Sequence, residues 1–264
     1  MVVGIVVLWD KSRANKTLED FLWLMRRIGR ESSIFAVCNN HEIEVDVEGV
    51  DVIRWDNTLH EFGAWDFALQ RLGPDVRKRV SMVIFANDTF SHHRLWGWGE
   101  RAAFLIGFRR ALKRKLTFIG ATSSFGHEFY LRGCYMHEWV STYLFAITAD
   151  LMGQLNWEIK ADKSVLDACV KGGGKEESFF GNELDSNLKE HLCGWLFGRK
   201  SNRRWYGAAR LSAANAEFFY NKALCIMCEK LLTARVLSIG GNVENVYKSS
   251  MLKKLIKIHR DYFR

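Results

Sequence analysis

Residues 2–8 read Val-Val-Gly-Ile-Val-Val-Leu and are followed at once by Trp9-Asp10. Seven apolar residues in a row, most of them β-branched, predict a strand that is covered on both faces, because a strand with one wet face alternates apolar and polar residues. Covered strands favour a mainly parallel sheet that lies between layers of helices. Four further runs of strand length share this character, over residues 33–38, 50–55, 80–86 and 116–122.

Helical patterns separate these strands. Apolar residues recur at helical spacing over residues 17–28, and Thr17 with Asp20 resembles a capping box at the start of that helix. A second helix is predicted over residues 61–72, before Gly73-Pro74. The order of strands and helices is typical of an α/β sandwich with right-handed crossovers. The expected fold class is therefore α/β, with a Rossmann-like, mainly parallel sheet flanked by helices.

The pattern becomes largely helical after residue 135. We therefore expect two domains: residues 1–212 form the α/β domain, and residues 213–264 form a helical C-terminal extension that packs on it and is basic at its end. The clearest helical segments span residues 135–152, 184–197, 213–238 and 248–263.

Composition excludes several classes of protein. A chain that is 48% hydrophobic and 26% charged is neither disordered nor collagen-like. Its six cysteines lie apart, except for Cys225 and Cys228, which is typical of reduced thiols and not of a secreted disulfide framework. No basic segment precedes residues 2–8 as in a signal peptide, and no apolar run is long enough to span a membrane. We expect a cytoplasmic protein.

The charge is unevenly distributed. Residues 1–100 carry 12 Lys and Arg against 15 Asp and Glu, whereas the rest of the chain carries 26 against 15. A basic second half favours a polyanionic partner or a phosphate-bearing substrate, or is simply a solvated surface. Residues 248–264 combine six cations with apolar residues, which suits a helix lying on an anionic membrane, and equally a solvated helix or a dimer contact. Nucleic acid is a less favoured partner.

Polar residues follow every predicted strand. Because the carboxyl ends of parallel strands meet at one edge of the sheet, and ligands of open α/β sheets bind there, this edge is the default site. Taken singly, each residue is most often a cap or a turn residue. The strand ends carry Trp9-Asp10, Asn39-Asn40, Asp56-Asn57, Asn87-Asp88-Thr89 and Thr122-Ser123-Ser124.

Two of these segments resemble a known family. Residues 57–69 and 87–90 are similar to nucleotide-sugar glycosyltransferases of the GT-A type. More closely, Asn87-Asp88-Thr89 followed by residues 118–123 and 137–145 resembles the rhamnan-synthesis protein F family of bacterial polysaccharide biosynthesis, over roughly residues 2–200.

The resemblance implies a GT-A-like fold and the transfer of a hexosyl or deoxyhexosyl group, with inversion, from a nucleotide-sugar to a lipid-linked surface glycan. It implies a catalytic base at Glu183, with Asp185 as the alternative, and acceptor contacts at His137 and Trp139. The alternative reading of both carboxylates is that they complement the dipole of the following helix. The nucleotide-sugar would be bound by Trp9, Asn39, Asp56, Asn57, Glu61, Gly63, Asn87 and Asp88.

The diphosphate leaving group of such a donor must be neutralised. Asp88 is the predicted metal ligand, for Mn²⁺ or Mg²⁺. The segment supplies one carboxylate where the Asp-X-Asp of family-2 enzymes supplies two, so cations such as Arg94 and Arg132 are a substitute for the metal. Two other functions stay open: a transferase-like subunit that binds without catalysing, and a nucleic-acid-binding α/β protein.

Overall fold

The computed structural model describes residues 1–29, 31–92, 96–198, 205 and 207–247. The chain forms two compact units. The sheet unit consists of Met1–Thr122, Val140–Ile159 and the described residues from Ile239 on. The helical unit consists of Ser123–Trp139 and Lys160–Ser238. Each unit takes segments from both sides of the predicted boundary after residue 212; the division into 1–212 and 213–264 stays a prediction.

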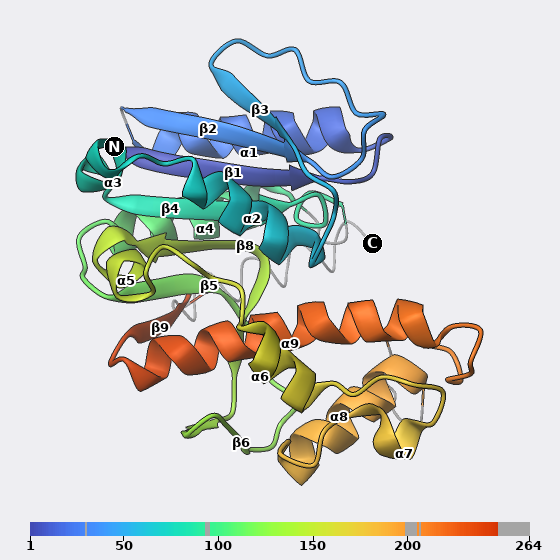
Figure 1. Cartoon of the computed structure of the whole chain (residues 1–264). Coiled ribbons are helices and arrows are strands. Elements are labelled where there is room, and N and C mark those ends of the chain that lie inside the picture. The colour runs from blue at the N-terminus through green and yellow to red at the C-terminus, as the bar shows by residue number, and fades with distance from the viewer. Residues whose placement is uncertain (30, 93–95, 199–204, 206, 248–264) are drawn as a thin grey trace. The chain divides into compact units, whose positions relative to one another are not determined.

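A seven-stranded sheet forms the centre of the sheet unit (Figure 1). Its order is β3-β2-β1-β4-β8-β5-β9, in which β8 runs antiparallel to β4 and the pairs β3-β2, β2-β1, β1-β4 and β5-β9 are parallel. This mostly parallel sheet, flanked by helices, confirms the expected α/β fold class. The strands are β1 (Val2–Leu8), β2 (Ser32–Cys38), β3 (Val50–Arg54), β4 (Met82–Asn87), β5 (Thr117–Ser123), β8 (Trp139–Thr148) and β9 (Asn242–Asn245).

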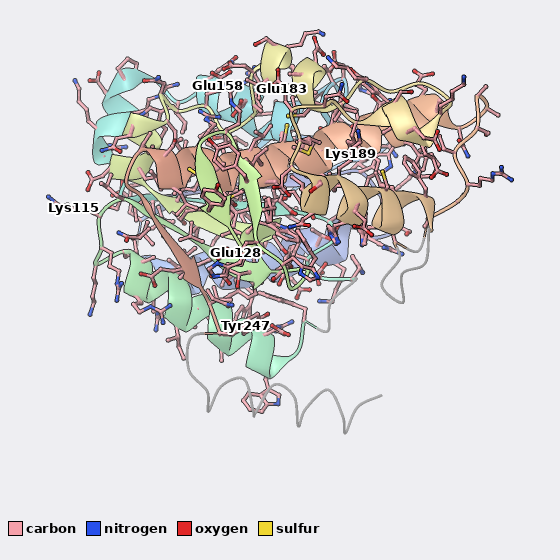
Figure 2. The ribbon with its side chains drawn as sticks, turned by 90° about the horizontal axis from the view of Figure 1, so that it is seen from below. Lys115, Glu128, Glu158, Glu183, Lys189 and Tyr247 are labelled. Atoms are coloured by element: carbon pink, nitrogen blue, oxygen red, sulfur yellow. The ribbon has the colours of Figure 1, made fainter. Side chains whose placement is uncertain are left out.

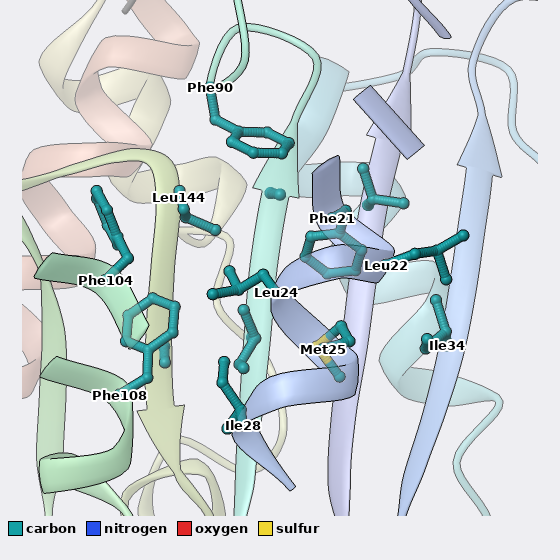
Figure 3. Close-up of a cluster of buried hydrophobic side chains, with 14 of the residues drawn as sticks. Phe21, Leu22, Leu24, Met25, Ile28, Ile34, Phe90, Phe104, Phe108 and Leu144 are labelled. Atoms are coloured by element: carbon teal, nitrogen blue, oxygen red, sulfur yellow. The ribbon is translucent and has the colours of Figure 1, made fainter. Parts of the chain in front are cut away.

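Helices cover both faces of this sheet. On one face, α1 (Ala14–Ile28) and α4 (Trp98–Ala111) bury Phe21, Met25 and Phe104 (Figure 3). The contact is close, because a Cβ added at Gly4 of β1 would lie 2.8 Å from the thioether of Met25. On the other face, α2 (His60–Gln70) buries Trp65, whose indole N–H donates to the Ala86 carbonyl of β4 at 3.1 Å. The short helices α3 (Pro74–Arg79) and α5 (Ala149–Gln154) complete the unit.

The helical unit has a core built mainly of aromatic rings. Phe179, Phe197 and Phe219 meet edge to face with centroid separations of 5.2 and 5.3 Å. Such contacts join α7 to α8 and α8 to α9 without the hydrogen-bonded ladder that unites a sheet. The elements are the hairpin β6 (Phe129–Leu131) and β7 (Cys134–Met136), and the helices α6 (Lys163–Cys169), α7 (Glu176–Phe179), α8 (Ser186–Phe197) and α9 (Ala216–Ser238).

The prediction of a helix over residues 135–152 was wrong. Residues 139–148 form β8, and all ten of its side chains are buried. Its wealth of β-branched and aromatic residues, such as Val140, Tyr143 and Ile147, favours a strand that is covered on both faces. The predicted helices over residues 184–197 and 213–238 are confirmed as α8 and α9. The helix predicted over 248–263 lies outside the described residues.

The predicted capping box was also wrong. The α1 helix begins at Ala14, so Thr17 and Asp20 lie inside it and are both buried. Asp20 instead accepts hydrogen bonds from Arg101 at 2.8 Å and Lys16 at 2.6 Å. In the part of the chain that the structure describes, no helix is both long and apolar enough to cross a membrane.

Candidate functional site

The carboxyl ends of the two central strands are tied together by one carboxylate. Asp88 follows β4, and its Oδ2 accepts the backbone N–H groups of Trp9 at 3.1 Å and Asp10 at 2.8 Å, just beyond β1. Bonds to a charged acceptor are stronger than those between neutral groups. Its other oxygen, Oδ1, accepts no hydrogen bond from the described residues. Asp88 is therefore fixed in position and still presents one carboxylate oxygen.

A buried amide lies at the end of the neighbouring strand. Asn39 follows β2 and is only 4% exposed. Its Nδ2 donates to Asn57 Oδ1 at 2.9 Å and to the His60 carbonyl at 3.3 Å, whereas its Oδ1 has no partner among the described residues. A buried acceptor without a partner costs about 1–3 kcal/mol. A ligand that donates one hydrogen bond to Oδ1 would recover that cost.

The loop between β3 and α2 has a strained backbone. Asn57, Leu59 and His60 have φ values of 66°, 55° and 49°, in the left-handed region that L-residues seldom adopt. The loop closes tightly against the helix, because a Cβ at Gly63 would lie 2.0 Å from the Thr58 carbonyl oxygen. Strain of this kind gathers at functional sites.

Asp56 precedes this strained segment. It accepts the backbone N–H of Thr58 at 2.9 Å, and its hydrogen bonds from Thr58 hold the pKa of its carboxyl below the ordinary value. Asp56 is exposed and Glu61, in the first turn of α2, is half-buried, so both carboxylates border the loop from the solvent side.

Trp9 and Asp10 follow β1 at the same edge. The Trp9 indole is 53% exposed, while its backbone is held by Asp88 and by the Asn40 amide, which donates to the Trp9 carbonyl at 3.1 Å. Hydrogen bonds from Ser12 lower the pKa of the Asp10 carboxyl. Asp10 and Asn40 were not among the predicted ligand contacts, although the strand-end rule that selected Trp9 and Asn39 applies to both.

The metal prediction can be compared with this geometry. Among the residues that the structure describes, no three His, Cys, Asp or Glu side chains lie together as a metal cluster. Mg²⁺ and similar ions bound with nucleotides commonly use one or two protein carboxylates and take their other ligands from phosphate and water. The open Oδ1 of Asp88 fits such a shared site. Of the alternative cations, Arg132 is exposed with a φ of 51°, and Arg94 lies outside the described residues.

The predicted base and acceptor residues lie in the helical unit. Glu183 is exposed in the turn before α8 (Figure 2). Asp185 is the N-cap of α8, where its Oδ1 accepts from the backbone N–H groups of Asn187 at 2.8 Å and Leu188 at 3.4 Å. His137 is exposed between β7 and β8. The predicted nucleotide contacts, in contrast, all belong to the sheet unit.

Trp139 belongs to a buried polar cluster. It is 6% exposed, and its indole N–H donates to Glu229 Oε1 at 2.7 Å. The Lys230 ammonium lies 3.9 Å from its ring centroid and 3.8 Å from Glu229 Oε1. Burial lowers the pKa of Lys230 to about 8. Burial and the Lys230 charge lower the pKa of the neighbouring His191 to about 4. The Trp139 ring is therefore buried against Glu229 and Lys230, and it is not exposed to an acceptor.

Comparison with known proteins adds little to this geometry. No protein-family model matches the sequence, and no curated protein matches it. One solved structure with a similar course of the chain is a mannosyltransferase from Pyrobaculum calidifontis, in complex with GDP-mannose and Mn²⁺. It is 8% identical, with a TM-score of 0.39, over 99% of this chain and 79% of that one.

Proposed function

We propose that this protein is a glycosyltransferase that takes a sugar from a nucleotide-sugar donor. The observation that carries the proposal is the carboxyl edge of the sheet, where a buried amide with an unpartnered oxygen follows β2 and a rigidly held carboxylate follows β4, on either side of β1. Asp88, and the Asn57 that holds the amide, belong to the segments whose sequence resembles GT-A glycosyltransferases. An edge of this kind is where α/β sheets bind nucleotides.

The donor would be bound by groups with distinct tasks. The exposed Trp9 indole offers an apolar face for a base or a sugar ring. Asn39 Oδ1 accepts a hydrogen bond from the nucleoside, with Asn57 and the loop before Gly63 keeping the amide in place. Asp56, Glu61 and Asn87 border the same edge and contact hydroxyl groups. Asp88 would hold a divalent cation, Mn²⁺ or Mg²⁺, through Oδ1, and such an ion would supply positive charge for the diphosphate leaving group.

The helical unit would supply the base. Glu183 removes the proton from the acceptor hydroxyl while the oxygen attacks the anomeric carbon, and the bond to the diphosphate breaks with inversion. Glu183 is preferred over Asp185, because capping of α8 already engages the Asp185 carboxylate. His137 would contact the acceptor, and Trp139 would support that contact from beneath.

The finer assignment follows the resemblance to the rhamnan-synthesis family. We infer transfer of a hexose or deoxyhexose to a lipid-linked surface polysaccharide, an O-antigen or a capsule glycan. The protein would then work in the cytoplasm, on the inner face of the membrane.

Donor binding is tested by thermal shift and calorimetry with UDP-, dTDP- and GDP-sugars, with and without Mn²⁺. We expect one nucleotide class to bind, and Asn39→Ala to weaken it about tenfold or more, since about 1–3 kcal/mol is at stake in an unpartnered buried group. The exposed Asn221→Ala, on α9, is the matched control. Asp88→Asn retains an acceptor for the Trp9 and Asp10 N–H groups and should lose the Mn²⁺ dependence of binding. Binding of no nucleotide-sugar to folded protein would overturn the proposal.

Transfer is tested separately from binding. Glu183→Gln should abolish transfer and leave donor affinity unchanged, whereas Asp185→Asn should retain transfer. Donor binding without transfer by the unaltered protein, to any lipid-linked acceptor, would instead favour a subunit that binds without catalysing. The single carboxylate of Asn87-Asp88-Thr89 is the observation that keeps that second function open.

A further inference from the structure

The amino edge of the sheet, opposite the candidate site, is strongly basic. Right-handed crossovers bring α1, α3 and α4 back to this edge, and each of them ends in cations (Figure 1). Arg26 and Arg27 end α1, residues 77–79 end α3, and Arg109 and Arg110 end α4. Helix dipoles favour one or two cations in each last turn. They do not explain why three more cations, at positions 113–115, follow α4 in the loop to β5.

The cations of this edge outnumber the carboxylates with which they pair. Lys78 pairs with Asp75 at 3.0 Å, and Arg79 pairs with Glu31 at 3.8 Å. Arg110 and Arg114 share the buried Glu244, at 3.3 and 2.5 Å. Lys113 and Lys115 are exposed and have no ion-pair partner within the described ranges. Figure 2 shows the Lys115 side chain extending away from the ribbon. Exposed like charges held side by side raise the positive potential and are stabilised by an external anion.

Two arginines at this edge are also held together by the backbone. Arg109 donates from Nε and Nη2 to the Arg27 carbonyl oxygen, at 3.1 and 2.5 Å. The ends of α1 and α4 are thereby joined, and their two guanidinium groups belong to one surface. The surface is therefore built on packed secondary structure and does not depend on mobile side chains alone.

The surface contains a hollow of the size of a headgroup. A cavity of about 340 Å³ lies between the 112–115 loop and the start of α5, and its lining includes Ser81, Thr148 and all three cations of the loop. Hydroxyl and backbone groups beside lysines suit a phosphate ester. Asp150, at its rim, is the one acidic residue of the lining.

An apolar residue is exposed beside this loop. Ile239 is 37% exposed and precedes β9, whose Asn242 N–H donates to the Leu116 carbonyl at 2.7 Å. Cations combined with an exposed aliphatic side chain are typical of a surface that binds at the membrane interface. Single-stranded nucleic acid, in contrast, is bound by aromatic stacking, and the exposed aromatic residues of the described sheet unit, Trp9 and Trp98, both lie toward the opposite edge.

We infer that the amino edge, centred on residues 113–115, docks the sheet unit on an anionic lipid surface. The parallel strands β1, β2 and β4 of the unit then run away from the membrane. This inference does not depend on the proposed transferase activity. It also differs from the predicted membrane contact of residues 248–264, because it assigns the contact to the folded sheet unit.

The test is co-sedimentation of the full chain with vesicles of phosphatidylcholine alone or mixed with one quarter phosphatidylglycerol. We expect binding to the mixed vesicles only, weakening steeply as salt rises. Each lysine near an anionic surface is worth roughly fivefold in affinity. The double variant K113E/K115E, whose side chains have no ion-pair partner to lose, should therefore bind at least twenty-fold more weakly.

Two control variants and a competing ligand test the inference further. K171E/K175E makes the same charge change in an exposed loop of the helical unit and should bind as the unaltered protein does. The variant K253E/K254E reports on the C-terminal segment; loss of binding there, with K113E/K115E unchanged, would overturn the inference. So would an absence of binding to mixed vesicles at low salt, or tighter binding of a fluorescent oligonucleotide than of vesicles through the same two lysines. Unchanged thermal unfolding shows that each variant is folded.

Discussion

The two units treat buried charge differently. In the sheet unit, the buried carboxylates of Asp20 and Glu244 each have two cationic partners at 3.3 Å or less. Two further buried carboxylates of this unit accept from neutral donors: Asp66 from the Ile159 N–H, and Glu100 from the Tyr247 hydroxyl. In the helical unit, Lys230 is 2% exposed, its carboxylate partner Glu229 lies 3.8 Å away, and a neutral His191 stacks on Phe125 nearby. Lys230 and His191, whose pKa values are lowered in the folded protein, take up protons on unfolding. The buried lysine and histidine of the helical unit should therefore make the stability of the protein depend on pH.

The direction in which stability changes with pH follows from the pKa shifts of His191 and Lys230. His191 and Lys230 are both harder to protonate in the folded protein, with pKa values of about 4 and about 8. Between the folded and the unfolded pKa, the unfolded chain binds more protons, so stability rises with pH. Two rising segments are expected, from about pH 4 to 6.5 for His191 and from about pH 8 to 10.5 for Lys230.

The largest expected effect comes from removing Glu229, the carboxylate that pairs with the buried Lys230. Glu229→Gln keeps an acceptor for the Trp139 N–H but leaves Lys230 without a counter-charge, which should cost about 3 kcal/mol at pH 7. The loss should shrink at pH 9.5, where Lys230 is mostly neutral. Urea unfolding at the two pH values measures both. An equal loss at each pH would mean that the charge of Lys230 is irrelevant.

The variant Gly63→Ala tests the sheet unit, where we expect a loss of stability that does not depend on pH. The added Cβ would meet the Thr58 carbonyl at 2.0 Å and force the 57–60 loop to move, at a cost of about 1–3 kcal/mol that does not vary with pH. Gly153→Ala in α5 is the matched control, since no atom lies within 4 Å of its added Cβ. Equal free energies of unfolding for the two variants would show that the 57–60 loop can move to accommodate the added Cβ at little cost.

A smaller effect is expected from His191, which should determine how stability falls below pH 6.5. His191→Phe retains the ring that stacks on Phe125, with centroids 4.4 Å apart, and removes the titrating group. The unaltered protein should lose about 2 kcal/mol between pH 6.5 and 4, with His191 partly screened by solvent, and the variant should lose less. His41→Gln, in the sheet unit, should leave the profile unchanged. A profile of His191→Phe that matches the unaltered protein would assign the slope elsewhere.

The smallest effect separates a structural carboxylate from a catalytic one. Asp185→Ala removes the N-cap of α8 and should cost about 1 kcal/mol of stability. Under the proposed function it leaves the transfer rate largely intact at a temperature where the variant is folded. A loss of transfer comparable to that of Glu183→Gln would reverse the two assignments.

The sequence predicted the sheet unit better than the helical unit. Buried strands such as β1 and β4 are continuous apolar runs, which can be recognised from the local sequence alone. Trp139 was predicted to contact an acceptor, and residues 135–152 were expected to form a helix. The residue instead begins β8, a strand whose side chains are all buried. The strand-end rule selected Asn39 and Asp88 as candidate site residues, which stays a prediction. It could not find their bonds, which join residues 18 and 79 positions apart and depend on strand register.

The pairing of β5 with β9 also sets an order of events during synthesis. Gly120 and Asn245 are partners in this parallel pair, yet β8 and most of the helical unit are translated between them. At 5–20 residues per second, the far edge of β5 stays open for roughly ten seconds after it leaves the ribosome. That edge displays Phe118 and Ile119 with unpaired backbone groups, which is the kind of strand that associates with other chains. Slow, cool expression with chaperones present should therefore raise the yield of folded protein.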